Sequence, residues 1–188
     1  AIVGFSDVLA SGGSSEEDQR NYFRIIQSNS DLLLRLINDI LDLSRLEANK
    51  VILTPEDCDV VQLCRQALSS VEMSRRESGN RFVFETKTDS FVLQTDIQRL
   101  QQVLINLLTN AAKFTKNGTI TLQFEVEKEK NRVLFAVADT GCGIPKEKQK
   151  QVFERFEKLN EYAQGTGLGL SICKLTVDKW GGDIWIDP

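Results

Sequence analysis

Residues 96–114 read DIQRLQQVLINLLTNAAKF and contain neither glycine nor proline. Asp96, or Thr95 before it, is a residue type that accepts a hydrogen bond from the first unpaired N–H groups of a helix. At about 100° per residue, one broad face of such a helix carries apolar side chains only. These are Ile97, Leu100, Leu104, Leu107, Leu108 and Ala111. The stretch therefore predicts a helix over 96–114 that is buried along one side.

The opposite face of this predicted helix carries Asn106, Asn110 and Lys113, at positions i, i+4 and i+7. Asparagine is a poor helix former because its side chain competes for backbone hydrogen bonds, so two aligned asparagines need a reason. An amide oxygen is a suitable ligand for a Mg²⁺ ion that already carries phosphate oxygens. A lysine one turn further along can neutralise those phosphates. Taken alone, the same pattern is also typical of a solvated polar face.

A second candidate site is predicted where a strand ends. The apolar run over 133–138 leads into Asp139, which is followed by Gly141, Gly143 and Ile144. A carboxylate at a strand end can accept a hydrogen bond from an exocyclic amine such as that of adenine. The two glycines would let the backbone approach a flat ring, and Ile144 could pack on it. An ordinary turn between a strand and a helix would account for the same residues.

The third feature is the glycine-rich stretch GTGLGLS over 165–171, which precedes a predicted helix. Backbone N–H groups at a glycine-rich helix N-terminus bind anions, and the helix dipole adds to that attraction. The spacing is neither that of a dinucleotide-binding G-x-G-x-x-G motif nor that of a P-loop. Each of the three features suits a different part of one ligand: the metal ion, the adenine ring and the phosphates. Together they predict a site for Mg-ATP.

The N-terminal part of the chain predicts a helical hairpin. An apolar stretch over 1–10 is followed by a Ser/Gly break over 11–15, and residues 16–48 contain no proline or glycine. Ser15 is a suitable N-cap, with Asp18 three residues further on. Over residues 23–44, mostly apolar positions recur in steps of three and four, which is the spacing of a heptad seam in a helical bundle. We expect two antiparallel helices, the first of them cut short.

The remaining chain predicts mixed helix and sheet. Residues 49–57 are expected to be a connector, in which Pro55 closes off helix. Helices are expected over 59–78, over 96–114, from about 146 and over 167–180, and strands over 81–87, 91–94, 119–127, 132–138 and 183–187. Helices and antiparallel strands in this order predict an α+β fold, a two-layer α/β sandwich. The expected divisions are a hairpin over 1–50, a linker over 51–58 and an α/β domain over 59–188.

Composition and charge exclude several classes of protein. The chain has 23 Lys and Arg against 27 Asp and Glu, a net charge of −4 that disfavours binding to nucleic acid. No stretch approaches the ~18 apolar residues of a membrane span, and no secretory signal opens the chain. The 188 residues include no histidine, so none can serve here as base, nucleophile or metal ligand. Cys58, Cys64, Cys142 and Cys173 form no C-x-x-C pair and indicate free thiols in the cytoplasm.

These motifs resemble those of the sensor histidine kinases of two-component systems. Residues 106–115 resemble the N box of that family, 139–145 the G1 box, 153–156 the F box and 165–171 the G2 box. Residues 1–50 resemble its dimerisation and phosphotransfer hairpin. The resemblance implies a Bergerat-type ATP-binding fold, ATP and Mg²⁺ as cofactors, a homodimer formed through the hairpin, and a response regulator receiver domain as partner. It implies no contact of this stretch with nucleic acid or membrane.

The resemblance also implies a role for each matching residue. Asn110 would ligate Mg²⁺, with Asn106 and Lys113 at the metal–phosphate end, and Asp139 would bind the adenine amine. The other ATP-binding residues that it implies are Phe114, Gly141, Gly143 and Ile144 near the ring, Lys158 near the terminal phosphate, and Gly165, Thr166, Gly167, Leu168 and Gly169 around the phosphates.

Both ends of the chain depart from the family pattern. The phosphoaccepting histidine of the family lies shortly before a segment like residues 1–6, and this chain has none. We therefore expect that the chain by itself does not autophosphorylate on histidine. The family usually continues past a segment like 186–188 into a final strand, and loss of that strand is expected to expose a sheet edge.

Two other functions fit the same motifs. The ATPase modules of gyrase and MutL share the fold, but they typically carry a glutamate where this chain has Asn106, because hydrolysis needs a base to activate water. An amide cannot act as that base, which favours the kinase. The third possibility is a non-catalytic ATP-binding interaction module. The intact N, G1 and G2 motifs argue against it, and tight binding of Mg-ATP would argue against it further.

Overall fold

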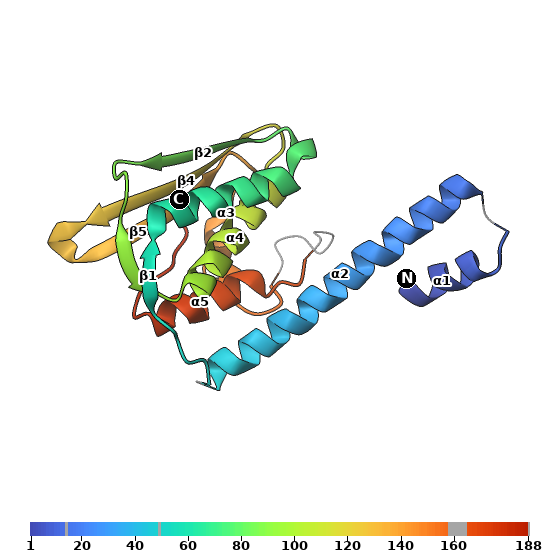
Figure 1. The fold of residues 1–188 in the computed structure, drawn as a ribbon, viewed down its shortest axis with the longest axis horizontal. Helices are drawn as coiled ribbons and strands as arrows, with labels where there is room; N and C mark the ends of the chain where they lie inside the picture. The colour runs from blue at the N-terminus through green and yellow to red at the C-terminus, as the bar shows by residue number, and fades with distance from the viewer. Residues whose placement is uncertain (14, 49, 158–164, 188) are drawn as a thin grey trace.

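The computed structural model describes residues 1–13, 15–48, 50–157 and 165–187. Its N-terminal part is the expected pair of helices, α1 (Ile2–Ala10) and α2 (Glu16–Glu47). The Ser15 hydroxyl caps α2 by accepting a hydrogen bond from the backbone N–H of Asp18 at 3.2 Å. The rings of Phe5 and Tyr22 stack with their centroids 5.2 Å apart and tie the two helices together. Figure 1 shows α2 extending beyond the rest of the chain, with α1 beside its N-terminal end.

The strands form two sheets. In the larger one, β4 (Thr119–Glu127) lies between β2 (Arg81–Thr86) and β5 (Arg132–Asp139). β4 is antiparallel to β5 but parallel to β2, so the sheet is mixed and not antiparallel as expected. The smaller sheet pairs β1 (Glu56–Asp59) with β3 (Val92–Thr95). The last residue of β5 pairs with the second residue of β4, so the end of β5 lies beside the turn that links helix α4 (Ile97–Phe114) to β4.

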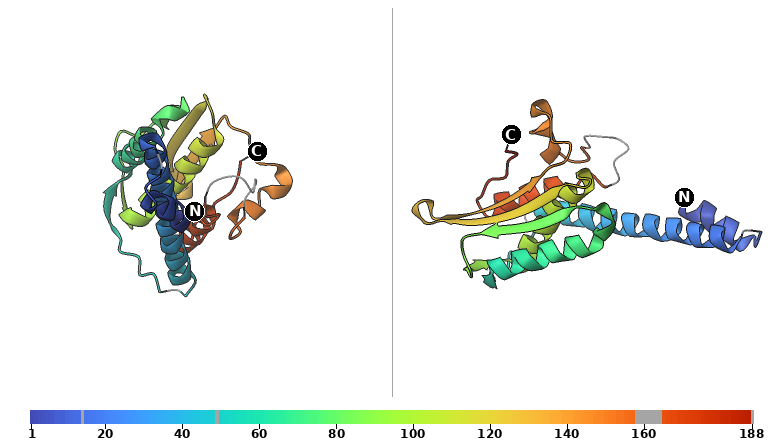
Figure 2. Two further views of the ribbon diagram at one scale, coloured as in Figure 1. Left: turned by 90° about the vertical axis from the view of Figure 1, so that its right-hand side faces the viewer. Right: turned by 90° about the horizontal axis from the view of Figure 1, so that it is seen from above.

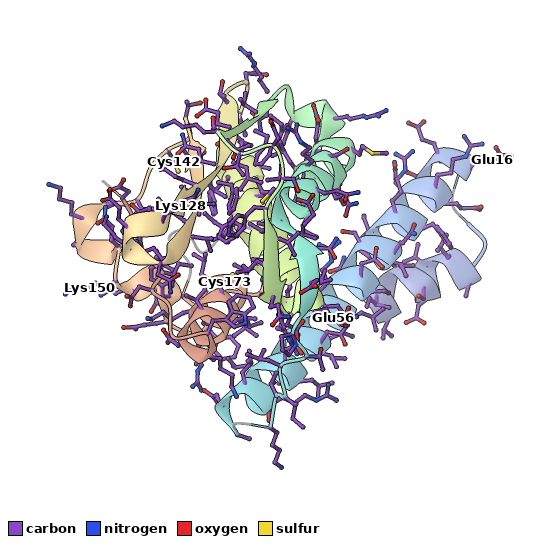
Figure 3. The ribbon with its side chains drawn as sticks, turned by 60° about the vertical axis from the view of Figure 1, so that its left-hand side comes forward. Glu16, Glu56, Lys128, Cys142, Lys150 and Cys173 are labelled. Atoms are coloured by element: carbon purple, nitrogen blue, oxygen red, sulfur yellow. The ribbon has the colours of Figure 1, made fainter. Side chains whose placement is uncertain are left out.

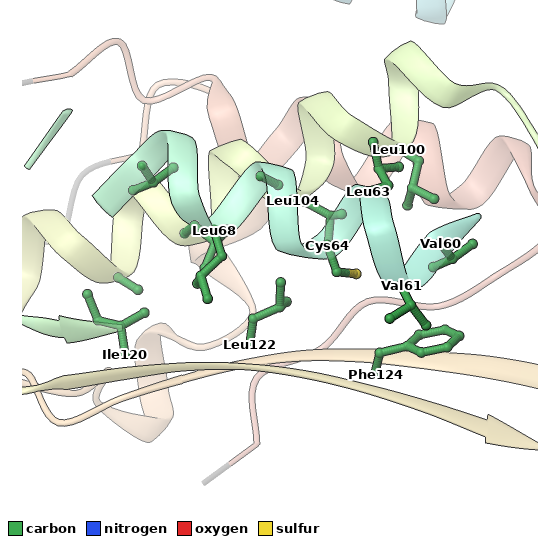
Figure 4. Packing of buried hydrophobic residues seen from close by; sticks show 14 of the residues in the cluster. Val60, Val61, Leu63, Cys64, Leu68, Leu100, Leu104, Ile120, Leu122 and Phe124 are labelled. Atoms are coloured by element: carbon green, nitrogen blue, oxygen red, sulfur yellow. The ribbon is translucent and has the colours of Figure 1, made fainter. Parts of the chain in front are cut away.

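Three helices complete the α/β part: α3 (Val60–Ser74), α4 (Ile97–Phe114) and α5 (Gly169–Lys179). Figure 4 shows α3 and α4 on one side of β4, with side chains of α3 pointing at the strand. The buried side chains that meet there are Val61, Cys64 and Leu68 from α3 and Ile120, Leu122 and Phe124 from β4. Burying an apolar side chain of this size contributes about 1.5–3 kcal/mol, so this contact is a main source of stability. The predicted two-layer α/β sandwich is confirmed.

The C-terminal half of α2 packs against α5. Leu43 and Leu46 of α2 are buried in a cluster with Leu168 and Ile172, which lie at the start of α5. Figure 2 shows the consequence from two further directions: α2 lies against the α/β part at one end and protrudes from it at the other. The hairpin helix is therefore in contact with the domain in which the glycine-rich motif lies.

Two predictions that depend on strand pairing were wrong. Glu56 and Asp57, expected in the connector, belong to β1. Only Cys58 of this strand is buried, so the strand has no alternation of apolar residues that would predict its pairing with β3. Residues 183–187, expected to be a strand, are not one, although their sequence alternates suitably. A strand needs a neighbour to complete its hydrogen bonds, and no other segment in the described part of the chain pairs with residues 183–187.

Three helix boundaries also differ from the prediction. The helix expected over 59–78 ends at Ser74 and is followed by a 3₁₀ turn, Arg76–Ser78, before Gly79 reverses the chain with a φ of +66°. The helix expected from about 146 is two 3₁₀ turns, Lys146–Lys148 and Gln151–Phe153. A further 3₁₀ turn, Lys128–Lys130, links β4 to β5. The helix expected over 167–180 spans 169–179.

Within the described ranges, none of the helices has the length and apolar character that a membrane crossing requires.

Candidate functional site

One face of α4 lines a groove of about 990 Å³, near the upper end of the ~300–1,000 Å³ that small-molecule sites occupy. Asn106, Asn110 and Lys113 all lie on this face, as their spacing predicts. The other face of α4 is buried in the core. The Asn106 amide donates a hydrogen bond to the carbonyl oxygen of Gly169 at 3.4 Å and so ties α4 to α5. Among the described residues, none forms a hydrogen bond with the Asn110 side chain, which therefore has its oxygen available to a ligand.

Asp139 lies at the end of β5, and hydrogen bonds fix its orientation. Its Oδ1 atom accepts a hydrogen bond from the backbone N–H of Gly141 at 2.8 Å and another from the hydroxyl of Thr115 at 3.3 Å. Thr115, which directly follows α4, is only 2 % exposed, whereas Asp139 itself is exposed. Both bonds fall on Oδ1, and none of the described residues donates a hydrogen bond to Oδ2. That oxygen is therefore available to accept a hydrogen bond from an amine of a ligand.

Further hydrogen bonds hold the turn after α4, which carries Thr115. The side-chain amide of Asn80 donates to the carbonyl oxygen of Thr115 at 2.9 Å and accepts from the backbone N–H of Gly118 at 3.1 Å. The Thr140 hydroxyl accepts from the backbone N–H of Thr119 at 3.0 Å. These bonds fasten the end of α4 to the beginning of β2 and the end of β5. They therefore fix the turn that holds Thr115 beside Asp139.

Gly141 brings the end of α4 and the end of β5 into close contact. A Cβ atom on Gly141 would lie 2.5 Å from the carbonyl oxygen of Phe114 and 2.7 Å from Oδ1 of Asp139. Real Cβ atoms do not approach so closely, so only glycine fits here. Gly143 adopts a φ of +68°, in the left-handed region that glycine occupies without strain. The first glycine thus allows close packing within the protein, and the second allows the chain to turn.

The glycine-rich segment reaches the same groove from the other side. A Cβ atom on Gly165 would lie 3.1 Å from Nζ of Lys113, so the ammonium group lies beside this backbone. Gly167 has a φ of +73°, and a Cβ atom there would lie 2.9 Å from the backbone of Phe156. The N–H of Phe156 donates to the carbonyl oxygen of Gly167 at 2.9 Å. The segment is therefore positioned by two neighbours, α4 and the chain around Phe156.

The structure brings most of the predicted site residues together. Those that line the groove are Asn106, Asn110, Lys113, Phe114, Asp139, Gly143, Ile144, Gly165, Thr166, Gly167 and Gly169. Gly141 does not line it and instead orients Asp139. The Leu168 side chain is fully buried against α2, and Leu168 does not line the groove. Lys158 lies outside the described residues.

Sequence reasoning missed several residues of the groove. Arg24, Arg35 and Asp39 of α2 line it, as does Cys142 after β5. The sequence of α2 could not reveal this, because its partners in the groove are distant in the chain, as Thr166 is 127 residues from Asp39. Thr115 is the last residue of the motif over 106–115, and a threonine after a helix carries no local signal of a role in binding.

The residues present fit Mg²⁺ only as a companion of phosphate. Among the described residues, no group of three or more Cys, Asp or Glu side chains could hold a metal ion. Mg²⁺ commonly keeps several waters and takes one or two protein ligands together with substrate phosphates. The available amide oxygen of Asn110, on the groove that Lys113 and the glycine-rich segment also line, matches that coordination.

The cysteines divide into buried thiols and one exposed thiol. Burial raises the pKa of Cys64 to about 12 and that of Cys173 to about 12, so both stay protonated and unreactive. Cys142 is exposed and lies on the groove. Figure 3 marks Cys142 and Cys173, which lie in different parts of the domain.

Comparison with known proteins gives matches over both parts of the chain. Residues 95–188 match the family described as histidine kinase-, DNA gyrase B- and HSP90-like ATPase, and residues 1–49 match the His Kinase A (phospho-acceptor) domain. The circadian input-output histidine kinase CikA of Synechococcus elongatus is 38% identical over 195 residues, which cover 99% of this chain and 26% of that protein. The chain thus spans about a quarter of the length of this relative.

Two solved structures share the fold over almost the whole chain. Full-length ShkA in complex with AMPPNP superposes with a TM-score of 0.80 at 29% identity, covering 100% of this chain and 39% of that one. Histidine kinase ThkA in complex with the response regulator protein TrrA gives a TM-score of 0.76 at 28% identity, covering 98% of this chain and 52% of that one.

Proposed function

Because the chain belongs to the histidine kinases within the histidine kinase-, DNA gyrase B- and HSP90-like ATPase family, we propose that it is the ATP-binding core of a sensor histidine kinase. The reaction is transfer of the γ-phosphate of ATP to a histidine and then to an aspartate of a response regulator. The chain contains no histidine, so the phosphoacceptor lies outside this sequence. One observation carries the proposal: the amide and lysine face of α4, the carboxylate of Asp139 and the glycine-rich segment converge on one groove.

Each end of the groove suits one end of ATP. Oδ2 of Asp139 accepts a hydrogen bond from the adenine amine, with Phe114 and Ile144 beside the ring. Gly165, Thr166 and Gly167, together with the backbone at the start of α5, surround the phosphates. Lys113 neutralises phosphate charge from the facing helix.

Asn110 would hold Mg²⁺ through its amide oxygen. When bound, the metal ion would offset the negative charge that develops during transfer. Phosphoryl transfer needs mainly positioning and charge neutralisation, so no side chain of this groove has to act as a base. Asn106 donates its amide hydrogen to Gly169 and cannot activate water, which favours transfer to a protein acceptor over steady hydrolysis.

The hairpin supplies the remaining functions of a kinase. We assign residues 1–50 to dimerisation and phosphotransfer, 51–58 to a linker that ends in β1, and 59–188 to catalysis. Along α2, the side chains of Phe23, Leu33 and Ile37 are 64%, 49% and 45% exposed. Apolar side chains in a heptad seam that stay exposed in one copy favour a helical bundle with a second copy. A receiver domain is the expected acceptor, as ThkA was solved with a response regulator, and the location is cytoplasmic, where ATP is available.

The test is calorimetric titration of the 188-residue chain with a non-hydrolysable ATP analogue, with and without Mg²⁺. We expect that Asp139→Ala abolishes detectable binding and that Asn110→Ala makes the affinity insensitive to Mg²⁺. Asp89→Ala and Asn38→Ala, which change the same residue types at exposed positions away from the groove, should bind as the parent chain does. Unchanged titrations of both site variants would refute the assignment of the groove.

A further inference from the structure

The hairpin helix α2 reaches the phosphate end of the groove. The Thr166 hydroxyl donates a hydrogen bond to Oδ2 of Asp39 at 2.8 Å, and its oxygen accepts one from the backbone N–H of Leu168 at 3.2 Å. Asp39 and Thr166 both line the groove. A carboxylate of α2 thus binds, through a single hydroxyl group, the backbone at the start of α5.

This relay uses the groups that an anion would need. Backbone N–H groups at a helix N-terminus are natural partners for phosphate oxygens, and Leu168 is the N-cap residue of α5. While Thr166 accepts from Leu168 and donates to Asp39, neither the N–H nor the hydroxyl is available to phosphate. The carboxylate has the same sign of charge as phosphate, so occupation of this place by both is disfavoured.

The contact at Thr166 is one end of a continuous interface between α2 and the α/β part. Asp42, three residues after Asp39, binds the guanidinium of Arg99 at 3.1 Å and the amide of Gln102 at 2.9 Å. Glu47 forms an ion pair with Arg155. Between them, the buried leucines of α2 pack on the start of α5. Positions 39, 42, 43, 46 and 47 share one helical face, so α2 docks or leaves as a unit.

The link to Thr166 is the weak point of this interface. Burial raises the pKa of Asp39 and outweighs the opposing effect of the hydrogen bond from Thr166. The charges facing Asp39 are those of Asp42, which adds to the effect of burial, and of Arg35, which opposes it. An ionised Asp39 is therefore poorly stabilised in the docked position, unlike Asp42. A competitor for Thr166 can displace it.

We propose that Asp39 and the phosphates of the nucleotide compete for Thr166, so that docking of α2 lowers nucleotide affinity and nucleotide binding releases α2. Asp39 acts through Thr166 and is in that sense a positioning residue. The proposal rests on the function proposed above, since it concerns the regulation of the same site. The apparent affinity for nucleotide is reduced by the fraction of molecules in which α2 is docked.

The first experiment measures affinity for the Mg²⁺ complex of a non-hydrolysable ATP analogue. Asp39→Ala should bind it about threefold to tenfold more tightly, as expected for loss of a competing hydrogen bond to a charged group. Asp39→Asn keeps a hydrogen-bond acceptor without the charge, so its affinity should fall between those of the parent chain and Asp39→Ala. Glu17→Ala is the matched control, because it removes an exposed carboxylate from the same helix at a position that does not line the groove. It should change the affinity less than about twofold.

A double-mutant cycle assigns the effect to Thr166. In a Thr166→Val background, Asp39→Ala should change the affinity by less than about twofold, because the shared hydroxyl is gone. An equal gain in both backgrounds would mean that Asp39 acts by charge alone and would overturn the proposal. A Thr166→Ser variant keeps the hydroxyl and should retain the gain, which controls for folding.

Amide hydrogen exchange reports docking directly. Adding nucleotide to the parent chain should speed exchange over residues 39–47, and Asp39→Ala should do so without nucleotide. If the parent chain binds nucleotide but Asp39→Ala leaves affinity and exchange unchanged, or weakens binding, the proposed competition is wrong while the proposed function stands. If neither the parent chain nor any variant binds nucleotide, both are wrong.

Discussion

At the scale of single residues, the groove depends on how Asp139 is oriented. The hydrogen bonds from Thr115 and from the backbone of Gly141 both fall on Oδ1 and leave Oδ2 for a ligand. A carboxylate alone on a strand end would rotate freely, and its selectivity for one amine would suffer. Gly141 therefore matters as much as the carboxylate, since any larger residue would separate the end of α4 from the end of β5.

Gly141→Ala should destabilise the fold by about 2–3 kcal/mol and weaken nucleotide binding, because the new methyl group would meet a backbone oxygen that cannot move aside. Urea unfolding and the nucleotide titration measure the two effects. Gly4→Ala makes the same change on the exposed surface of α1, where no atom lies within 4 Å, and should stabilise α1 slightly. Equal stability of Gly141→Ala and the parent chain would show that the turn can rearrange.

The sequence predicted Asp139 but not Thr115, for a physical reason. A carboxylate that ends an apolar run is visible in a single stretch of sequence. Thr115 accepts a hydrogen bond from Asn80 and donates one to Asp139, and these partners are 35 and 24 residues away. A role that depends on such distant partners leaves no local signal.

Cysteine reactivity provides an independent test of where the groove lies. In the folded chain a maleimide should label Cys142 rapidly, while Cys64 and Cys173, with pKa values of about 12, should react only after unfolding. Nucleotide should slow labelling of Cys142, because that thiol lies on the groove. Mass spectrometry of tryptic peptides identifies the labelled residue. Rapid labelling of Cys173 in the native protein would contradict the packing described for α5.

At the scale of elements, predictions succeeded where the signals were local. The helix expected over 96–114 is observed as Ile97–Phe114 with Asp96 as its N-cap, because both cap and apolar face are written in consecutive residues. The strand β1 and the wrongly expected strand over 183–187 show the opposite case. Whether a segment becomes a strand depends on a partner elsewhere in the chain, which its own alternation does not specify.

The cap of α4 joins two elements and should therefore be costly to remove. Oδ1 of Asp96 accepts from the backbone N–H of Arg99 at 3.0 Å, and Oδ2 accepts from the N–H of Thr54 at 3.3 Å. Asp96→Ala should lower the free energy of unfolding by about 2 kcal/mol, since the carboxylate is buried and satisfies both donors.

Thermal or urea unfolding measures this loss. Ser15→Ala removes the exposed cap of α2 and should cost less, about 0.5–1 kcal/mol. If the two variants lost the same stability, the link between Asp96 and the segment before β1 would contribute nothing.

At the scale of the whole molecule, the position of α2 is the feature that sequence analysis missed most completely. The hairpin and the α/β domain were each predicted from their own patterns. Their contact rests on pairs such as Asp39 with Thr166 and Asp42 with Arg99, which are 127 and 57 residues apart. Each partner, examined alone, resembles an ordinary solvated side chain.

The Asp42 contact should make this docking depend on pH in a defined direction. Burial alone would raise the pKa of Asp42, but hydrogen bonds from Arg99 and Gln102 outweigh it and lower the pKa below its usual value of 3.8. A carboxyl group whose pKa is lower in the folded state contributes stability above its unfolded value and loses that contribution as the pH falls through the folded value. The ion pair is about a fifth exposed, with side-chain exposures of 18% and 22%, so about 1 kcal/mol is expected.

Asp42→Asn should therefore be about 1 kcal/mol less stable than the parent chain at pH 7, and this difference should shrink as the pH falls below 3.8. Asp39→Asn should behave in the opposite way, because burial raises the pKa of Asp39. An ionised Asp39 costs stability once the pH rises above 3.8, so its replacement should be neutral or stabilising at pH 7. Urea unfolding of the three chains across this pH range measures both trends. If the difference in free energy of unfolding between Asp42→Asn and the parent chain stayed constant across this pH range, the ion pair with Arg99 would not hold α2 in solution. The docking of α2 would then have to depend on its other contacts.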